Sequence, residues 1–132
     1  MFFCGANFMS TYYTRLYSDE NGASHFEDAQ VDLALTDYAP PAPSLSISAF
    51  TPAKQFGFMQ APAGWSSDWH ATSVRTMFFV LRGEWEVTAS DGETRSFRVG
   101  SVLLAEDTDG KGHTSRVVSE VDSLAAMLEL NE

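Results

Sequence analysis

Short stretches in which hydrophobic and polar residues alternate recur along most of the chain. Hydrophobic residues alternate with serines over residues 44–49, and the same period of two returns at Phe56 and Phe58. This period places the hydrophobic members on one face of a half-buried strand. The cluster Ala-Pro-Ala-Gly at residues 61–64 then predicts a turn.

The segment from residue 76 to residue 97 predicts two or three consecutive strands. The run 76–81, Thr-Met-Phe-Phe-Val-Leu, is too short for a helix and is followed by Arg-Gly, which favours a buried strand. Alternation continues from Trp85, and the dipeptide Asp91-Gly92 is a strong signal for a tight hairpin turn.

Further strands are predicted on both sides of this segment. Residues 24–35 fit an early edge strand, which ends at a proline-rich stretch that lacks backbone donors. Strands are also predicted at residues 101–105, 115–118 and 124–130, although propensity alone allows a helix in the last of these. About nine short strands and no long helix imply an all-β antiparallel sandwich or barrel. The residues expected in its core are Leu45, Ile47, Phe79, Leu81, Val102 and Leu104.

The length and charge of the chain restrict its partners. It has 132 residues, of which 44% are hydrophobic, enough for one soluble domain with a single core. With 18 acidic residues against 8 Lys and Arg, the formal net charge is −10. Such a chain repels phosphate backbones and anionic lipids, so we expect neither nucleic acid nor a membrane as a partner.

The first residues match no strong structural pattern, so we expect residues 1–10 to be a variable leader and residues 11–132 to be one domain. The start lacks the basic segment of a signal peptide, and no apolar run approaches the roughly 18 residues of a membrane span. The single cysteine, Cys4, has no partner for a disulfide or a zinc site. These observations fit a reducing compartment, and we expect a cytoplasmic protein.

A histidine and two glycines occur at a spacing that resembles a known motif. Gly64 is followed six residues later by His70, and Gly83 closes the segment. The first motif of the cupin family runs Gly, five residues, His-x-His, three or four residues, Glu, six residues, Gly. Here Thr72 stands at the second histidine position and Thr76 at the glutamate position. The spacing of the motif is therefore matched, but its second histidine and its glutamate are absent.

The second cupin motif, which runs Gly, five residues, Pro-x-Gly, two residues, His, is matched less closely. After Gly100, Glu106 stands at the proline position, and the histidine position falls on Lys111, two residues before His113. An insertion of two residues in the loop 107–112 would bring His113 into that role, since loop length is easily varied.

The resemblance covers about residues 44–130 and implies a double-stranded β-helix, the jelly-roll cupin barrel, with a small-molecule pocket at its open end. Cupins typically hold a divalent metal ion on three histidines and a glutamate and catalyse diverse reactions, while others bind effectors without changing them. Because open sheet edges need cover, and many cupins pair, the resemblance also implies a homodimer. It says little about the substrate.

The candidate site is centred on two histidines. Together with Trp69, Thr72 and Thr76, His70 and His113 are expected to line a pocket for a small organic ligand. Three roles stay open for His70: a ligand of a divalent transition metal, an interior histidine hydrogen-bonded to a neighbouring strand, or a catalytic general base or ligand-binding group.

A metal site needs three or four imidazole or carboxylate ligands, and threonine hydroxyls are poor substitutes. Besides His70 and His113, the chain offers Asp68, in phase with His70, and Glu106, at the end of a neighbouring strand. We expect a metal-free or weakly metal-binding protein. The alternative is a metal-dependent enzyme, a lyase, isomerase or oxygenase, that uses His70 and His113.

Other side chains near the first motif have less specific roles. Trp65 and Trp69 flank His70 and suit either the wall of a ligand pocket or the packing of the barrel and its dimer face. Arg75 is expected to point outward by alternation, and His25 is expected at the surface.

Overall fold

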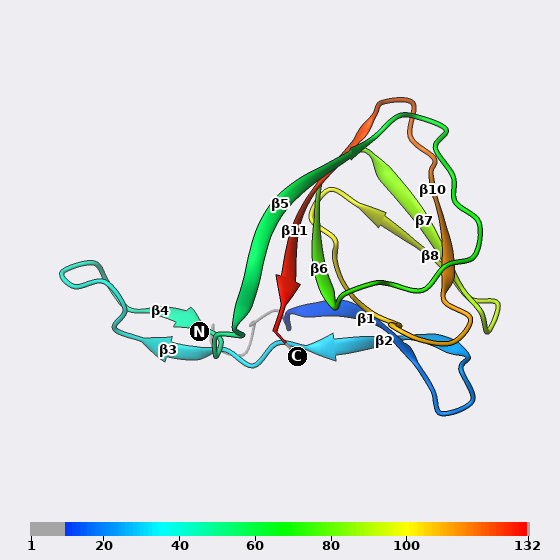
Figure 1. Cartoon of the computed structure of the whole chain (residues 1–132). Coiled ribbons are helices and arrows are strands. Elements are labelled where there is room, and N and C mark those ends of the chain that lie inside the picture. Colours follow the sequence, from blue (N-terminus) through cyan, green and yellow to red (C-terminus); the bar gives the residue numbers. More distant parts are fainter. Residues whose placement is uncertain (1–9, 132) are drawn as a thin grey trace.

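The computed structural model describes residues 10–131, which form eleven β-strands and no helix. Figure 1 shows a barrel of strands with a narrow extension on one side. The described part contains no helix with the length and apolarity to cross a membrane. The predicted leader, apart from Ser10, and Cys4 lie outside the described residues. The strands are β1 Tyr12–Ser18, β2 Ser24–Gln30, β3 Ala34–Thr36, β4 Leu45–Ile47, β5 Ala53–Ala61, β6 Thr76–Arg82, β7 Glu84–Ala89, β8 Thr94–Arg98, β9 Val102–Glu106, β10 His113–Val117 and β11 Ser123–Leu130.

Eight strand positions form two facing sheets. In the larger sheet β5, β11, β6 and β9 are neighbours, and the smaller sheet contains β10, β7 and β8. The fourth position of the smaller sheet belongs to residues 66–70, which pair with β10 through bridges from Ser66 to Arg116 and from His70 to His113. Along the chain, these strands cross between the sheets in the order of a jelly roll. The all-β class predicted from the sequence is therefore confirmed.

Two strands from the N-terminal part extend the larger sheet. β1 pairs in parallel with β9, and β2 pairs antiparallel with β1 at the edge of the sheet. Leu16 of β1 is fully buried. The sequence analysis predicted no strand over residues 12–18, because this single aliphatic residue lies among tyrosines and polar residues without alternation.

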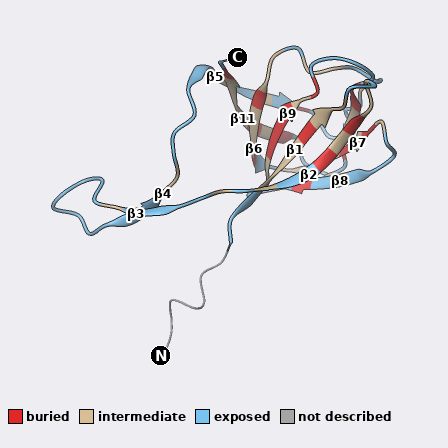
Figure 2. Cartoon of the chain, turned by 90° about the horizontal axis from the view of Figure 1, so that it is seen from below, coloured by how far each residue is buried: buried red, intermediate tan, exposed pale blue. Residues whose placement is uncertain are grey.

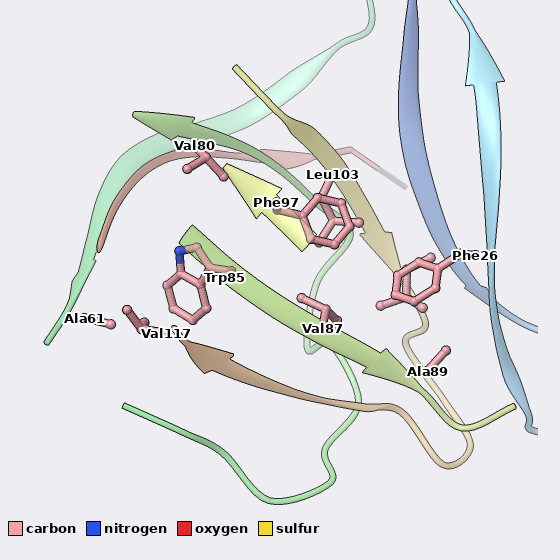
Figure 3. Packing of buried hydrophobic residues seen from close by; sticks show 10 residues of the cluster. Phe26, Ala61, Val80, Trp85, Val87, Ala89, Phe97, Leu103 and Val117 are labelled. Atoms are coloured by element: carbon pink, nitrogen blue, oxygen red, sulfur yellow. The ribbon is translucent and has the colours of Figure 1, made fainter. Parts of the chain in front are cut away.

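The hydrophobic core lies between the two sheets. Trp85, Val87 and Ala89 of β7 are buried at every second position, and they form one cluster with Phe97 of β8 and Leu103 of β9 (Figure 3). Burial of a large apolar side chain contributes about 1.5–3 kcal/mol. The alternation predicted from Trp85 is confirmed.

The tight turn predicted at Asp91-Gly92 joins β7 to β8. Gly92 has a φ of 98°, a left-handed conformation that favours glycine. Its N–H donates to the carbonyl of Ala89 at 3.0 Å. The run 76–81 forms β6, and the last apolar stretch forms strand β11 rather than a helix.

The inward face of several strands differs from the prediction. In β6, hydrophobic residues occupy both faces, so the pattern does not identify the inner one; Thr76 and Val80 face the interior and Phe79 lies on the outer face. Of the six residues expected in the core, only Leu104 is buried. Ile47, Phe79 and Val102 are half-buried, and Leu45 and Leu81 are exposed.

Residues 31–52 leave the barrel and form a projecting arm. Among residues 10–131, β3 and β4 of this arm pair with each other and with no other strand. Figure 2 shows the arm extending away from the barrel with most of its residues exposed. The strand predicted over residues 44–49 is therefore the short β4 in a solvent-exposed hairpin, and the predicted strand 24–35 is divided between β2 and β3.

A histidine between two carboxylates joins the β1–β2 turn to the β7–β8 turn. His25 Nε2 lies 2.7 Å from an Asp19 oxygen, and its Nδ1 lies 2.9 Å from an Asp91 oxygen. The hydrogen bonds with Asp19 and then Asp91 raise the pKa of His25 above its ordinary value. The bond with His25 lowers the pKa of Asp19, and the backbone N–H of Glu93 is the main cause that lowers the pKa of Asp91.

We expect this contact to stabilise the protein at acidic pH and to lose its effect at alkaline pH. Because the pKa of His25 is raised on folding, its contribution is complete below the unfolded value of about 6.5 and is lost as the pH rises through the folded-state pKa. The difference in free energy of unfolding between wild type and His25→Gln, measured in urea, should therefore shrink as the pH rises from about 5 to about 9. A difference that grows over this range would contradict the contact.

Candidate functional site

The two sheets enclose a cavity that is partly open to solvent. Its volume is about 270 Å³, just below the range of roughly 300–1,000 Å³ that is typical of ligand pockets. The apolar part of its wall is formed by Met59, Trp65, Ala71, Phe78, Val80, Trp85, Val87, Phe97, Leu103, Ala105, Ala125 and Met127. The polar residues of the lining are His70, Thr72, Ser73, Thr76, His113, Ser115 and Glu129.

Two imidazoles lie against each other at this cavity. Residues 66–70 run antiparallel to β10, and His70 and His113 exchange two backbone hydrogen bonds of 3.0 and 2.9 Å. Their ring centroids are 4.6 Å apart, with the ring planes inclined by 55°. The two rings therefore lie side by side, as the sequence analysis expected, but His113 is buried while His70 is exposed at the mouth of the cavity.

Gly112 permits this close approach. Its φ is 71°, and a Cβ atom at this position would overlap with the carbonyl oxygen of His70. The N–H of Lys111 donates to the carbonyl of Gly22 at 2.9 Å, which holds the loop against the β1–β2 turn. Only a residue without a side chain lets the loop enter β10 beside His70.

A buried carboxylate holds the ring of His113. Asp107 is fully buried, and its Oδ2 lies 2.6 Å from Nδ1 of His113. Its Oδ1 accepts a hydrogen bond of 2.7 Å from the hydroxyl of Thr72. The carboxylate therefore has two side-chain partners, as a buried polar group requires.

The sequence analysis singled out Glu106 at the end of β9, whereas the structure places the next residue, Asp107, in the interior. Ala105 lines the cavity, so strand alternation puts Glu106 on the outer face, where it pairs with Arg15 and with the outward-pointing Arg75. Residues two apart in a strand share a face. Because Asp107 lies two residues after Ala105, continued alternation would have predicted that its side chain points inward.

The hydrogen bonds determine which nitrogen of each ring carries a proton. Nδ1 of His70 lies 2.9 Å from the backbone carbonyl oxygen of Asp68, which can only accept, so this nitrogen donates. Nδ1 of His113 donates in the same way to the carboxylate of Asp107. In the neutral rings, both Nε2 atoms are therefore hydrogen-bond acceptors.

The other predicted pocket residues divide between the cavity and the surface. Thr72 and Thr76 line the cavity, but their hydroxyls already donate within the protein. Trp69 is 54% exposed and does not contribute to the cavity lining. Trp65 does line it and packs edge-on against Trp85, with ring centroids 5.6 Å apart.

The donors at the cavity do not fit a three-ligand metal site. Transition-metal sites have three or four converging side-chain ligands. Asp68 is exposed and meets His70 only through its backbone carbonyl, while Asp107 is held by His113 and Thr72. Within residues 10–131, no group of three or more His, Cys, Asp or Glu side chains is arranged to hold a metal ion.

Comparisons with known proteins found similar structures. No protein-family model matches the chain, and no curated protein matches it. The chain is similar to a cupin 2 conserved barrel domain protein from Salinispora arenicola, with 16% identity over 76% of each chain and a TM-score of 0.48. It is similar to the cupin domain of Cnp3 from Schizosaccharomyces pombe, with 15% identity, 97% of this chain and 89% of that chain covered, and a TM-score of 0.47. A cupin-2 domain containing protein from Shewanella frigidimarina has 15% identity, 58% and 70% coverage, and a TM-score of 0.46.

The chain has a double-sheet jelly-roll fold. This conclusion depends on the strand order of its two sheets, with the segment that carries His70 and the strand that begins at His113 paired side by side. Similarities at these identities and TM-scores carry no information about a ligand or an activity.

We expect Gly112→Ala to destabilise the site more than a comparable change elsewhere. An alanine in the left-handed backbone conformation costs about 1–2 kcal/mol. At this position its Cβ atom would also overlap with the His70 carbonyl. Gly92→Ala is the matched control, because Gly92 has a φ of 98° but no atom within 4 Å of the added Cβ. Urea unfolding measures both losses. Equal losses would show that the approach of Gly112 to His70 contributes nothing.

Removal of the buried carboxylate should release the ring of His113. In Asp107→Ala, Nδ1 of His113 and the hydroxyl of Thr72 lose their partner, which costs about 1–3 kcal/mol. Imidazole ¹⁵N NMR should show Nδ1–H tautomers for neutral His70 and His113 in the wild type, and a changed signal for His113 in the variant. An Nε2–H tautomer of His113 in the wild type would contradict the hydrogen bond to Asp107.

Proposed function

We propose that the chain binds a small neutral organic molecule inside the barrel. The observation that carries this proposal is the pair of imidazoles, His70 and His113, at an otherwise largely apolar cavity. Ligand pockets combine apolar walls with a few polar groups that fix the orientation of the ligand. The proposal depends on the site, because the fold is shared by proteins with unrelated functions.

The polar groups favour a ligand that donates hydrogen bonds. With both Nδ1 atoms engaged, the Nε2 atoms accept from a hydroxyl or an N–H group. In the described residues, the cavity lining includes Glu129 but no Lys or Arg, so an anionic ligand would find no compensating cation. A compact apolar body with a hydroxyl group therefore fits the cavity best.

Asp107 is a positioning residue in this proposal, because it acts on the ligand only through His113. A carboxylate on Nδ1 holds an imidazole in one tautomer and one orientation. The same pair would let His113 exchange a proton with the bound molecule. If the chain is an enzyme, His113 would then act as a general acid or base. Two imidazoles without a third strong ligand would hold a divalent transition metal only weakly.

Tryptophan fluorescence tests the proposal directly. Two of the three tryptophans of the chain, Trp65 and Trp85, line the cavity, and the variant Trp69→Phe leaves these two as the only reporters. Cyclohexanol should change their emission with a Kd of about 1 mM, and cyclohexanecarboxylate of the same shape should bind about tenfold more weakly. An emission that responds to neither probe would overturn the proposal.

The contribution of the imidazoles is tested by His70→Phe in the Trp69→Phe background. The variant keeps a ring but removes the accepting nitrogen. The loss of one hydrogen bond, about 0.5–1.5 kcal/mol, should weaken cyclohexanol binding about two- to thirteenfold. His25→Gln is the control, because this histidine lies outside the cavity. Unchanged affinity in His70→Phe would show that the imidazole does not bind the ligand.

A further inference from the structure

One carboxylate of the cavity wall takes no part in holding the imidazoles. Glu129 of β11 is half-buried and lines the cavity together with Ala125 and Met127, the inward-facing residues of the same strand. Within residues 10–131, it is the only titratable residue of the lining besides the two histidines. A charged group beside a largely apolar wall needs hydrogen-bond donors to replace the water it has lost.

The backbone register places Glu129 in a row of residues across the larger sheet. It pairs with Thr76 of β6, which pairs in turn with Ala105 of β9, and all three residues line the cavity. Figure 1 shows the end of β11 beside the start of β6. Neighbouring strands lie about 4.8 Å apart, so Glu129 stands about 10 Å across the sheet from β9.

The imidazoles lie at the same end of the barrel, toward the β9 side of this row. Asp107 follows Ala105 by two residues, and its carboxylate holds the ring of His113, which lies against the ring of His70. A molecule in the cavity therefore meets hydrogen-bond acceptors on two sides. The imidazole Nε2 atoms are on one side and the carboxylate of Glu129 is on the other.

Glu129 keeps one oxygen for a ligand. Its Oε1 accepts a hydrogen bond of 2.6 Å from Nε2 of Gln55, the residue that pairs with it in β5. In the part of the chain that the structure describes, this is the only hydrogen bond to its side chain, and no Lys, Arg or His forms an ion pair with it. A carboxylate has about four acceptor sites, so Oε2 remains able to accept.

We propose that Glu129 is a specificity-determining residue of the cavity, and that the ligand is a diol with a ring-sized apolar body between its two hydroxyl groups. One hydroxyl donates to the imidazoles and the other, on the opposite side of the body, donates to Oε2 of Glu129. This inference rests on the proposed function, because it concerns the same cavity. A hydroxyl fits better than an ammonium group, since removing an ion from water costs more than one carboxylate shared with Gln55 returns.

The arrangement of the two acceptors distinguishes between isomers of one molecule. A six-membered ring with hydroxyls at positions 1 and 4 presents them on opposite sides, so both acceptors are used. The isomer with hydroxyls at positions 1 and 2 presents both on one side and reaches only one of them. The two isomers have the same atoms and nearly the same polarity, so a difference in affinity reports the positions of the acceptors.

Tryptophan fluorescence of the Trp69→Phe chain measures this difference, because Trp65 and Trp85 line the cavity. The diol trans-1,4-cyclohexanediol should bind about tenfold more tightly than cyclohexanol, since it adds one hydrogen bond to a charged acceptor. It should also bind about tenfold more tightly than trans-1,2-cyclohexanediol, for which Glu129 is out of reach.

The role of Glu129 is tested by Glu129→Met in the same background. Methionine keeps an unbranched side chain of similar length but removes the carboxylate, so the preference for the 1,4-diol over cyclohexanol should disappear. The affinity for cyclohexanol should stay within about twofold, which also shows that the cavity is intact. Glu120→Met is the matched control, because this exposed carboxylate lies outside the cavity lining, and it should retain the tenfold preference.

Three results would overturn the inference. Equal binding of the 1,4-diol and cyclohexanol, or a preference that survives Glu129→Met, excludes Glu129 as an anchor, while binding of cyclohexanol leaves the proposed function standing. Tighter binding of the 1,2-isomer would place both hydroxyls on the imidazole pair. A chain that binds none of the three probes would overturn the proposed function itself.

Discussion

The structure depends on covering the inner face of the larger sheet, which carries apolar side chains on both of its faces. In β6, Phe78 and Val80 face the cavity while Phe79 lies on the outer face. An antiparallel sheet usually covers one face and presents polar residues on the other. The smaller sheet covers the inner face here and leaves a cavity of about 270 Å³. On the outer face, Leu104 is buried, whereas Phe56 and Phe58 at the β5 edge are exposed.

The site depends on a second constraint, the burial of Asp107. A carboxylate removed from water needs donors, and the structure supplies Nδ1 of His113 from β10 and the hydroxyl of Thr72 from the loop after His70. These bonds tie together the segments that carry the two imidazoles. Gly112 completes the arrangement, because any side chain there would separate the backbones. The hydrogen bonds that compensate for the burial of Asp107 therefore also fix the orientation of the His113 ring and of its accepting Nε2 atom.

Alternation of hydrophobic and polar residues predicted the fold class. The meeting of His70 and His113 was predicted only from the resemblance to a family motif, with an assumed insertion in the loop 107–112, because the spacing itself pointed to Lys111. Alternation from Trp85 and the turn at Asp91-Gly92 are local signals, and the structure confirms them. The inner face of β6 could not be predicted, because a run of consecutive apolar residues does not show which alternate set points inward. Asp107 was missed for a related reason: adjacent to Glu106, it differs only in the face it occupies, and that face depends on the pairing of β9 with β6 and β1.

Because the same strands carry both faces, the cavity wall and the outer face of the larger sheet share one backbone. Met127 lines the cavity, and the next residue, Leu128, lies on the opposite face beside Phe56 and Met77. Interiors packed as densely as organic crystals transmit small displacements, so a contact on the outer face that shifts β11 also moves the cavity wall.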